Sequence, residues 1–239
     1  LFRSCRIGEA RVPGPSNQDD PAWSIGVCNP SGLQGKFHVL SSVPANIVAM
    51  SETHLTKGST RALRGSLHAM RSPFKKVITG APLQPRSTAS QAGTWAGVGF
   101  LTTCPSRTIS VPWPLDAYET SRIQFMSAYI DHGWVTGSVI YGYPTGKTHH
   151  HALSRTEALL DFASDHILTL PGERFLAGDW NYEQHELQVT QKLLAAGWVE
   201  AQTLHRDRTG AQPVSTCKGR TQKDFCWLSP ELALKFIDV

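Results

Sequence analysis

The sequence lacks the features that mark membrane-spanning and secreted proteins. No uninterrupted apolar run approaches the roughly 18 residues of a spanning helix, because stretches such as 47–50 and 125–130 end within a few positions. The first residues carry three arginines but no apolar segment of a secretion signal, and the chain opens on Leu1 rather than on Met. We therefore expect an intracellular protein with no membrane partner, of which this chain can be a fragment.

Paired cysteine motifs are also missing. The five cysteines are an odd number, are widely spaced and include no Cys-x-x-Cys pair. This pattern argues against a zinc ribbon and against a redox motif, so we expect reduced thiols.

Length and composition predict one large globular domain. Apolar residues make up 40% of the chain and charged residues 18%, which excludes intrinsic disorder. Dividing 239 residues by roughly 150 per domain favours one large domain over two small ones. Residues 12–21 are turn-forming with almost nothing to bury, so we predict a flexible N-terminal tail over 1–22 and a domain over 23–239.

Acidic residues are absent from one long segment. Between Lys57 and Leu115 the chain has eight Lys or Arg residues and no Asp or Glu. Such a segment can contact a polyanion if its charges gather on one surface, and it can equally be a solvated, solubilising face. The candidate nucleic-acid contacts are Lys57, Arg61, Arg64, Arg71, Lys75 and Lys76.

The apolar pattern predicts an α/β domain with a mixed sheet. A β-α-β order comes first, an antiparallel group of strands follows, and helices then alternate with strands. We expect strands over 23–28, 47–51, 97–102, 122–130, 134–141, 174–177, 198–204 and 224–228, and helices over 36–43, 154–168 and 183–196.

Polar residues stand where the apolar strands end. Asn29, Glu52 and Tyr141 each follow such a strand, and Asp179 with Asn181 follows another. Strand ends present side chains to a cleft, where carboxylate and amide oxygens can share one hard divalent cation. Mg²⁺ usually takes one or two protein carboxylates, so Glu52 supported by Asn29 is sufficient.

The order and spacing of these residues resemble the endonuclease/exonuclease/phosphatase superfamily, also called DNase I-like, over 23–239. The terse motifs are similar to those of endonuclease domains from non-LTR retrotransposons. The matching segments are 23–29, Ser-Glu-Thr-His at 51–54, Tyr-x-x-Pro at 141–144, Gly-Asp-x-Asn at 178–181 and the Asp-bearing strand at 223–229.

The resemblance implies a four-layer α/β sandwich of two stacked mixed sheets flanked by helices. It also implies cleavage of a phosphate ester with Mg²⁺, for which Mn²⁺ can substitute. Carried over residue by residue, Glu52 with Asn29 holds the metal, and Asp179 orients or deprotonates the attacking water. Asn181 and Tyr141 then donate hydrogen bonds to phosphoryl oxygens, and Asp224 orients a histidine.

The family pattern ends in a Ser/Asp-Asp-His motif after one more strand, whereas this chain stops at 236–239. The resemblance therefore implies that the last strand-loop and its catalytic histidine are absent here. We expect the 239-residue chain to be nearly inactive, and a chain extended through Asp-His to nick plasmid. Asp238 is interpreted as part of the strand before that loop, and 149–151 as a polar loop rather than a metal site.

The family acts on DNA, RNA, phosphoinositides and sphingomyelin. The acid-free segment and the retrotransposon-like motifs favour a monomeric endonuclease that nicks DNA, nuclear if DNA is the substrate. An inactive remnant or nucleic-acid-binding module remains an alternative, and so does an inositol or lipid phosphate phosphatase.

Overall fold

The structure is a computed structural model. It describes residues 2–7, 23–33, 36–41, 43–81, 96–111, 119–144, 149–213, 215–216 and 221–238. Among these residues, no helix combines the length and the apolar character needed to cross a membrane.

Two six-stranded mixed sheets form the centre of the molecule, in the orders β12-β1-β2-β3-β5-β4 and β10-β11-β9-β8-β7-β6. The first sheet contains β1 (Phe2–Ile7), β2 (Trp23–Cys28), β3 (Ile47–Met50), β4 (Lys76–Thr79), β5 (Gly99–Thr102) and β12 (Phe236–Asp238). The second contains β6 (Ser106–Thr108), β7 (Ile123–Ile130), β8 (Gly133–Tyr141), β9 (Glu173–Asp179), β10 (Val199–Glu200) and β11 (Asp224–Leu228).

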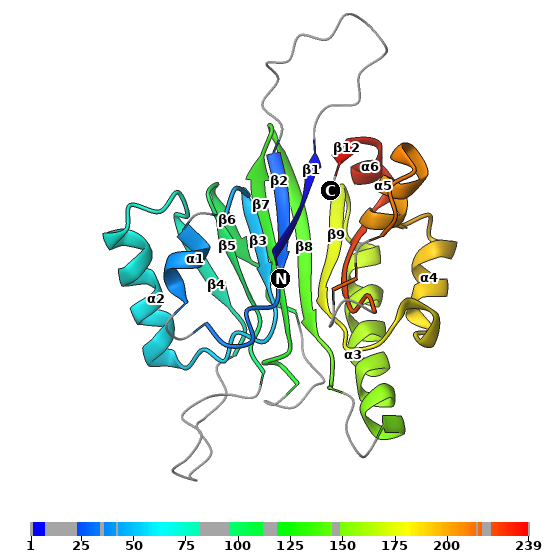
Figure 1. The fold of residues 1–239 in the computed structure, drawn as a ribbon, viewed down its shortest axis with the longest axis horizontal. Helices are drawn as coiled ribbons and strands as arrows, with labels where there is room; N and C mark the ends of the chain where they lie inside the picture. Colours follow the sequence, from blue (N-terminus) through cyan, green and yellow to red (C-terminus); the bar gives the residue numbers. More distant parts are fainter. Residues whose placement is uncertain are drawn as a thin grey trace, which may run out of the picture.

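Helices cover the outer faces of both sheets (Figure 1). On one side lie α1 (Phe37–Ser41) and α2 (Lys57–Ala69), and on the other lie α3 (His149–Thr169) and α4 (Val189–Ala195). The short helices α5 (Ala201–Thr209) and α6 (Pro230–Leu234) and the 3-10 turn η1 (Gln184–Glu186) complete the second side.

Three apolar clusters separate these layers. Ala49 and Phe100 of the first sheet pack with Phe175 of the second, so one cluster lies between the sheets. A second cluster joins α2 to the first sheet, and a third joins α3 and α4 to the second sheet. The predicted four-layer α/β sandwich is therefore confirmed.

The structure differs from the expected tail at residues 2–7. These residues form β1, which pairs antiparallel with β2 along its whole length and with β12 on its other side. The segment alternates too little for a strand signal, and the backbone pairing that defines it comes from chain regions far away in the sequence.

Three other segments differ from the predicted elements. The expected helix over 183–196 is divided into η1 and α4, because Leu187 between them has an extended backbone (φ −108°, ψ 120°). The expected strand over 198–204 shortens to β10, since Glu200 caps α5 by accepting a hydrogen bond from the Thr203 amide at 3.0 Å. The expected loop at 149–151 begins α3, and Asp238 lies in β12, as predicted.

Buried Glu200 predicts a pH-dependent stability. Its side chain is 3% exposed, and burial raises the pKa of Glu200 from 4.5 to about 7 despite hydrogen bonds that favour the charged form. The folded chain therefore keeps a proton that the unfolded chain releases between these pH values. The stabilisation is complete below about pH 4.5 and is lost as the pH rises through about 7, by on the order of 3 kcal/mol.

We expect Glu200→Gln to reduce the decline in stability between pH 5 and pH 8, because the amide is neutral throughout and can still cap α5, whereas Asp179 keeps its own contribution. Urea unfolding at pH 5 and pH 8 measures the difference. Asp165→Asn, a change at a carboxylate that is 71% exposed, serves as the control and should decline as the parent does. A Glu200→Gln variant that loses as much stability as the parent between the two pH values contradicts this account.

Candidate active site

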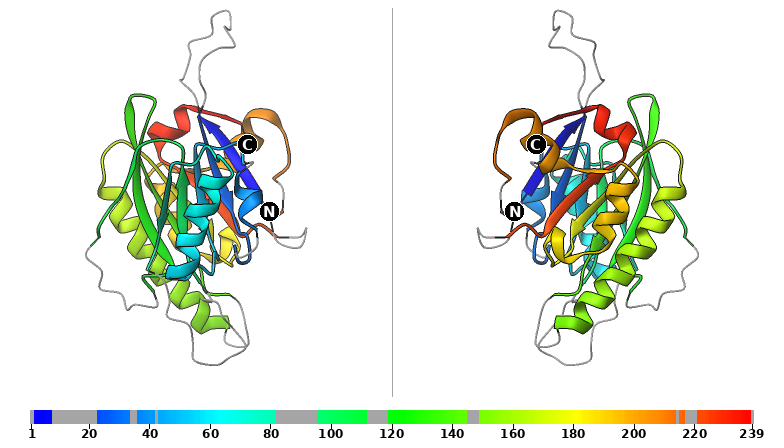
Figure 2. Two further views of the ribbon diagram at one scale, coloured as in Figure 1. Left: turned by 90° about the vertical axis from the view of Figure 1, so that its left-hand side faces the viewer. Right: turned by 90° about the vertical axis from the view of Figure 1, so that its right-hand side faces the viewer.

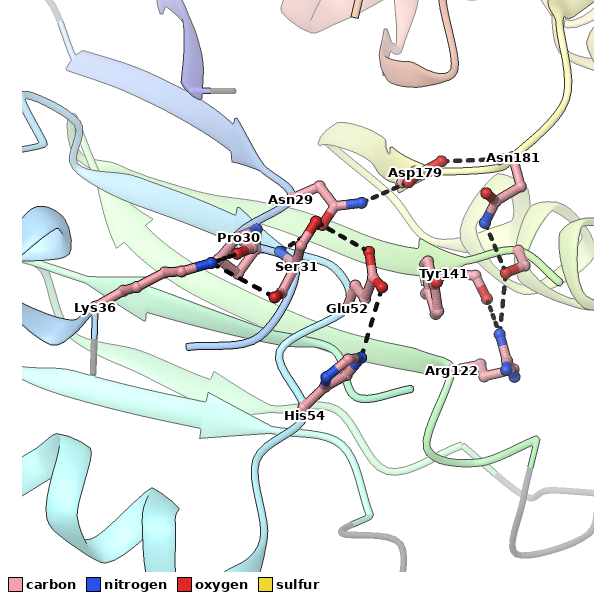
Figure 3. A network of polar contacts seen from close by, with 11 residues as sticks. Asn29, Pro30, Ser31, Lys36, Glu52, His54, Arg122, Tyr141, Asp179 and Asn181 are labelled. Carbon is pink, nitrogen blue, oxygen red and sulfur yellow. Dashed lines mark hydrogen bonds and ion pairs between the residues drawn. The ribbon is translucent and has the colours of Figure 1, made fainter. Parts of the chain in front are cut away.

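The predicted site residues meet at one edge of the sandwich because two pairs of parallel strands end there. In β2 and β3, Cys28 pairs with Met50, which places the following Asn29 and Glu52 together. In β8 and β9, Tyr141 pairs with Asp179. Figure 3 shows these side chains converging from the two sheets.

Asp179 is the central group of this arrangement. Its Oδ2 accepts a hydrogen bond from Asn29 Nδ2 at 2.6 Å, and its Oδ1 accepts one from the Asn181 amide at 2.9 Å (Figure 3). The first of these bonds joins residues 150 positions apart and connects one sheet to the other. The side chain is therefore held in one orientation, with 8% of the residue exposed.

The electrostatics of this position favour a proton acceptor near neutral pH. Burial raises the pKa of Asp179 to about 7, and the charge of Asp224, its partner across β9 and β11, adds to the rise. Hydrogen bonds from Asn181 and Asn29 oppose that rise. A buried carboxyl whose pKa lies close to neutrality is suited to general acid-base chemistry.

Glu52 stays charged at the same edge. Its backbone is left-handed (φ 52°), and its side chain is 24% exposed. The polar contact with His54, whose Nε2 lies 3.6 Å from Glu52 Oε1, is the largest cause that lowers the pKa of Glu52. The structure thus brings His54 to the cleft, beside the carboxylate and not in contact with Asp179.

The loop after β2 is held by residues that the sequence analysis did not single out. Asn29 Oδ1 accepts hydrogen bonds from the Ser31 amide at 2.8 Å and from Ser31 Oγ at 3.4 Å. Lys36 Nζ donates to the Pro30 carbonyl at 2.6 Å (Figure 3). Asn29 is therefore oriented so that its Nδ2 faces Asp179 and its Oδ1 lies on the Glu52 side.

Tyr141 and Asn181 form the opposite wall. Asn181 Nδ2 donates to the Gly142 carbonyl at 3.0 Å, which fixes this side chain against the end of β8. Burial, with the charges of Glu52 and Asp179, raises the pKa of Tyr141, so its hydroxyl remains protonated and can donate. Both side chains are thus available as hydrogen-bond donors at the cleft.

Arg122 supports this wall from below and was missed as a site residue. The residue is 2% exposed, and its guanidinium lies 5.0 Å from the Tyr141 ring centroid and 4.1 Å from that of Tyr143. Its Nη1 donates to the carbonyls of Tyr141 at 3.2 Å and Gly142 at 2.9 Å (Figure 3). Arg122 and Asn181 therefore both donate hydrogen bonds to the Gly142 carbonyl. No local pattern in the sequence indicates that these two side chains meet.

Gly178 allows Asp179 to reach the edge. Its φ of +136° is a conformation that side-chain-bearing residues rarely adopt, and a Cβ there would overlap the Ile140 carbonyl oxygen of β8. The glycine of the Gly-Asp-x-Asn motif is thus required by the close pairing of β8 and β9.

The donor set fits a hard divalent cation. Glu52 supplies a carboxylate oxygen and Asn29 an amide oxygen, Asp179 places a second carboxyl nearby, and within the described residues no Lys or Arg forms an ion pair with either acidic side chain. The charge of Glu52 contributes to raising the pKa of Asp179, so a cation would neutralise an existing repulsion. The described residues contain no cluster of three His, Cys, Asp or Glu side chains arranged to hold a metal, so waters or a phosphate would complete the coordination.

The candidate nucleic-acid contacts are not gathered at this edge. All six are exposed; Lys57, Arg61 and Arg64 lie on α2, Arg71 follows it, and Lys75 and Lys76 lie at the start of β4. Lys76 pairs with Thr102, which is also the partner of Ile47 at the beginning of β3. Lys76 is therefore level with the opposite end of β3 from Glu52.

Solved structures with a similar fold were found, although the sequence matches no family model and no curated protein. An AP endonuclease from Archaeoglobus fulgidus superposes with a TM-score of 0.61 at 13% identity, covering 87% of each chain. The 3′ phosphatase NExo from Neisseria, bound to product DNA hairpin, gives 0.59 at 18% identity, again over 87% of each chain. An endonuclease/exonuclease/phosphatase from Beutenbergia cavernae gives 0.53 at 14% identity, covering 84% of this chain and 62% of that one.

The chain therefore has the DNase I-like fold of these solved structures, which confirms the fold that the motif resemblance implies.

Proposed function

We propose that this protein is a divalent-metal-dependent phosphodiesterase that nicks DNA. The observation that carries the proposal is the position of Asp179, a buried carboxyl with a pKa of about 7 that accepts hydrogen bonds from the Asn29 side-chain amide and the Asn181 backbone amide and lies near the charged Glu52. Binding alone does not require a proton acceptor held in this way. Activation of a water for attack on phosphorus does.

Each residue of the edge has a role in this proposal. Glu52 and Asn29 hold Mg²⁺ or Mn²⁺, which when bound polarises a phosphoryl oxygen and neutralises developing charge. Asp179 orients the attacking water and takes its proton. Asn181 and Tyr141 donate hydrogen bonds to phosphoryl oxygens as charge builds. Asp224, which pairs with Asp179 across the strands, is the carboxylate that would orient the catalytic histidine implied by the resemblance.

DNA is the proposed substrate on three grounds. A protein of the same fold, NExo, has been seen with product DNA hairpin. The exposed cations of α2 and β4 supply positive charge of the kind that phosphate backbones require. The retrotransposon-like motif style points the same way, toward an endonuclease.

The metal site is tested by Glu52→Gln. We expect Mg²⁺ affinity, measured by calorimetric titration, to fall about tenfold or more, because even the hydrogen-bonding partners of metal ligands typically contribute about 10- to 100-fold. The fold should persist, since the side chain lies at an open edge. Asp165→Asn removes one carboxylate charge far from the edge and should leave the affinity unchanged.

Equal Mg²⁺ affinity in parent and Glu52→Gln would remove the metal assignment. The 239-residue chain and a form extended through Asp-His, each offered supercoiled plasmid, an RNA duplex and inositol phosphates, decide the substrate. Cleavage of inositol phosphates alone replaces DNA by an inositol phosphate substrate. Metal binding without cleavage of any phosphate ester by either form favours the inactive remnant.

A further inference from the structure

A groove on the outer side of the first sheet collects most of the candidate cations. It has a volume of about 740 Å³ between α2 and β4, and Arg64, His68, Arg71, Lys75 and Lys76 line it above the buried ring of Phe74. No Asp or Glu lies among its lining residues. In the left view of Figure 2, α2 faces the viewer on this side of the molecule.

The positive charges of the groove have no acidic partners among the described residues. Within the part of the chain that the structure describes, none of Arg64, Arg71, Lys75 and Lys76 forms an ion pair. Two cations on the second side of the molecule are paired, by contrast: Lys192 lies 2.6 Å from Asp165, and Arg206 lies 2.8 Å from Asp207. A cluster of like charges repels itself and attracts an anion.

Two of the four cations have a contact to the protein backbone. Arg64 Nη2 donates to the Val77 carbonyl at 3.2 Å, and Lys76 Nζ donates to the Ser106 carbonyl. The first contact fixes α2 against β4, and the second fixes the start of β4 against β6. The groove thus has a defined shape, while Arg71 and Lys75 project from it.

The groove is separate from the catalytic edge. Lys76 is level with Ile47 through their common partner Thr102, and Glu52 lies five positions beyond Ile47. At about 3.3 Å per strand residue, the two places are on the order of 15 Å apart along the sheet. Arg71 and Lys75 therefore cannot touch a phosphate that is being cleaved beside Glu52.

We propose that the α2–β4 groove binds the phosphate backbone of a nucleic acid a few nucleotides away from the cleaved bond. The proposal rests on the proposed function for the choice of a nucleic acid over other polyanions. With a rise of about 3.4 Å per nucleotide, the separation corresponds to about four or five nucleotides. The groove provides affinity and holds the substrate, and the edge performs the cleavage.

The test compares two double variants that remove the same charge. Arg71→Gln with Lys75→Gln removes two of the four positive charges of the groove. Both positions are exposed, and Gln at residue 71 adds no strain to the left-handed backbone (φ 52°) beyond that of Arg. Lys192→Gln with Arg206→Gln neutralises two paired cations elsewhere and is the matched control. Fluorescence anisotropy with a labelled 20-base-pair duplex in EDTA gives the affinity as a function of salt.

We expect the slope of log affinity against log salt to decrease in magnitude by about 1.8 in the groove variant, or about 0.9 for each phosphate that the variant no longer neutralises. The control variant should keep the parental slope. An unchanged slope in the groove variant, or an equal decrease in both variants, overturns the proposal. So does a groove variant that loses binding to phosphatidylserine vesicles while its duplex binding stays at the parental level.

This outcome is independent of the proposed function because the binding assay contains no metal and involves no turnover. If the slope changes in the groove variant but no form of the protein nicks plasmid, the groove proposal stands and the nuclease proposal fails. If the groove variant nicks plasmid with the parental kcat and its slope is unchanged, the nuclease proposal stands and the groove proposal fails.

Discussion

Replacing Asp179 with asparagine is expected to lower the rate of DNA nicking by about 10²- to 10⁴-fold, the usual contribution of a positioned acid-base group. Asparagine has nearly the same shape, and its side-chain oxygen can still accept the hydrogen bond from the Asn181 backbone amide. It cannot take a proton from water. The comparison is made in a form of the protein that cleaves DNA, whether the 239-residue chain or a longer one.

The same variant should be no less stable than the parent at pH 8. The pKa of Asp179 is raised by burial and by Asp224, so the folded state disfavours the charged carboxylate at that pH. A neutral side chain relieves this unfavourable charge, although it loses the hydrogen bond from Asn29. A substitution that lowers activity without lowering stability is expected at positions where a functional side chain is itself unfavourable for folding.

Asp165→Asn is again the control, because it makes the same chemical change at an exposed position of α3. Its nicking rate should equal that of the parent. An Asp179→Asn variant that nicks plasmid at more than about a tenth of the parental rate would show that another group activates the water, and His54 would be tested next. Thermal unfolding in EDTA tests whether a variant with a lower nicking rate is still folded.

Gly178→Ala is expected to destabilise the fold by about 4 kcal/mol or more, which is at the extreme of single substitutions. The added Cβ would overlap the Ile140 carbonyl oxygen, a backbone atom of β8 that cannot rotate away, and the φ of +136° would be strained as well. The overlap can be relieved only if β8 and β9 move apart, and these two strands carry Tyr141 and Asp179.

Gly65→Ala is the matched control for this substitution. Gly65 lies inside α2, and a Cβ built there meets nothing within 4 Å. Alanine should therefore stabilise the chain by about 0.5 to 1 kcal/mol, since glycine is unfavourable in a helix interior. Urea unfolding of both variants measures whether each substitution lowers or raises the free energy of unfolding. A Gly178→Ala chain as stable as the parent would contradict the packing at β8 and β9.

The strand ends could be predicted from the sequence because an apolar, buried run is followed there directly by polar residues that can take part in chemistry. Runs such as 47–50 and 175–177 are apolar throughout, and a polar residue that follows a fully buried run lies most readily in a cleft. Glu52 and Asp179 were found in this way, and the structure places them at one edge.

Other elements gave weaker signals. Only Thr60, Leu63 and Leu67 of α2 are buried, and its capping box uses Thr56 with Ser59 rather than the more familiar acidic residue. The basic residues therefore dominated the interpretation of this segment, and the helix was not predicted. Arg122 was missed for a different reason: its partners are carbonyls and rings brought near it by tertiary packing.

The hydrogen bond between Asn29 and Asp179 has a consequence for folding. It spans 150 positions and joins the two sheets, so the cleft cannot form while either half of the chain is still undocked. Contacts of such long sequence separation close late and slowly. A nascent or partly unfolded chain would therefore carry no assembled site, and the proposed cleavage of DNA would become possible only after the final docking of the two sheets.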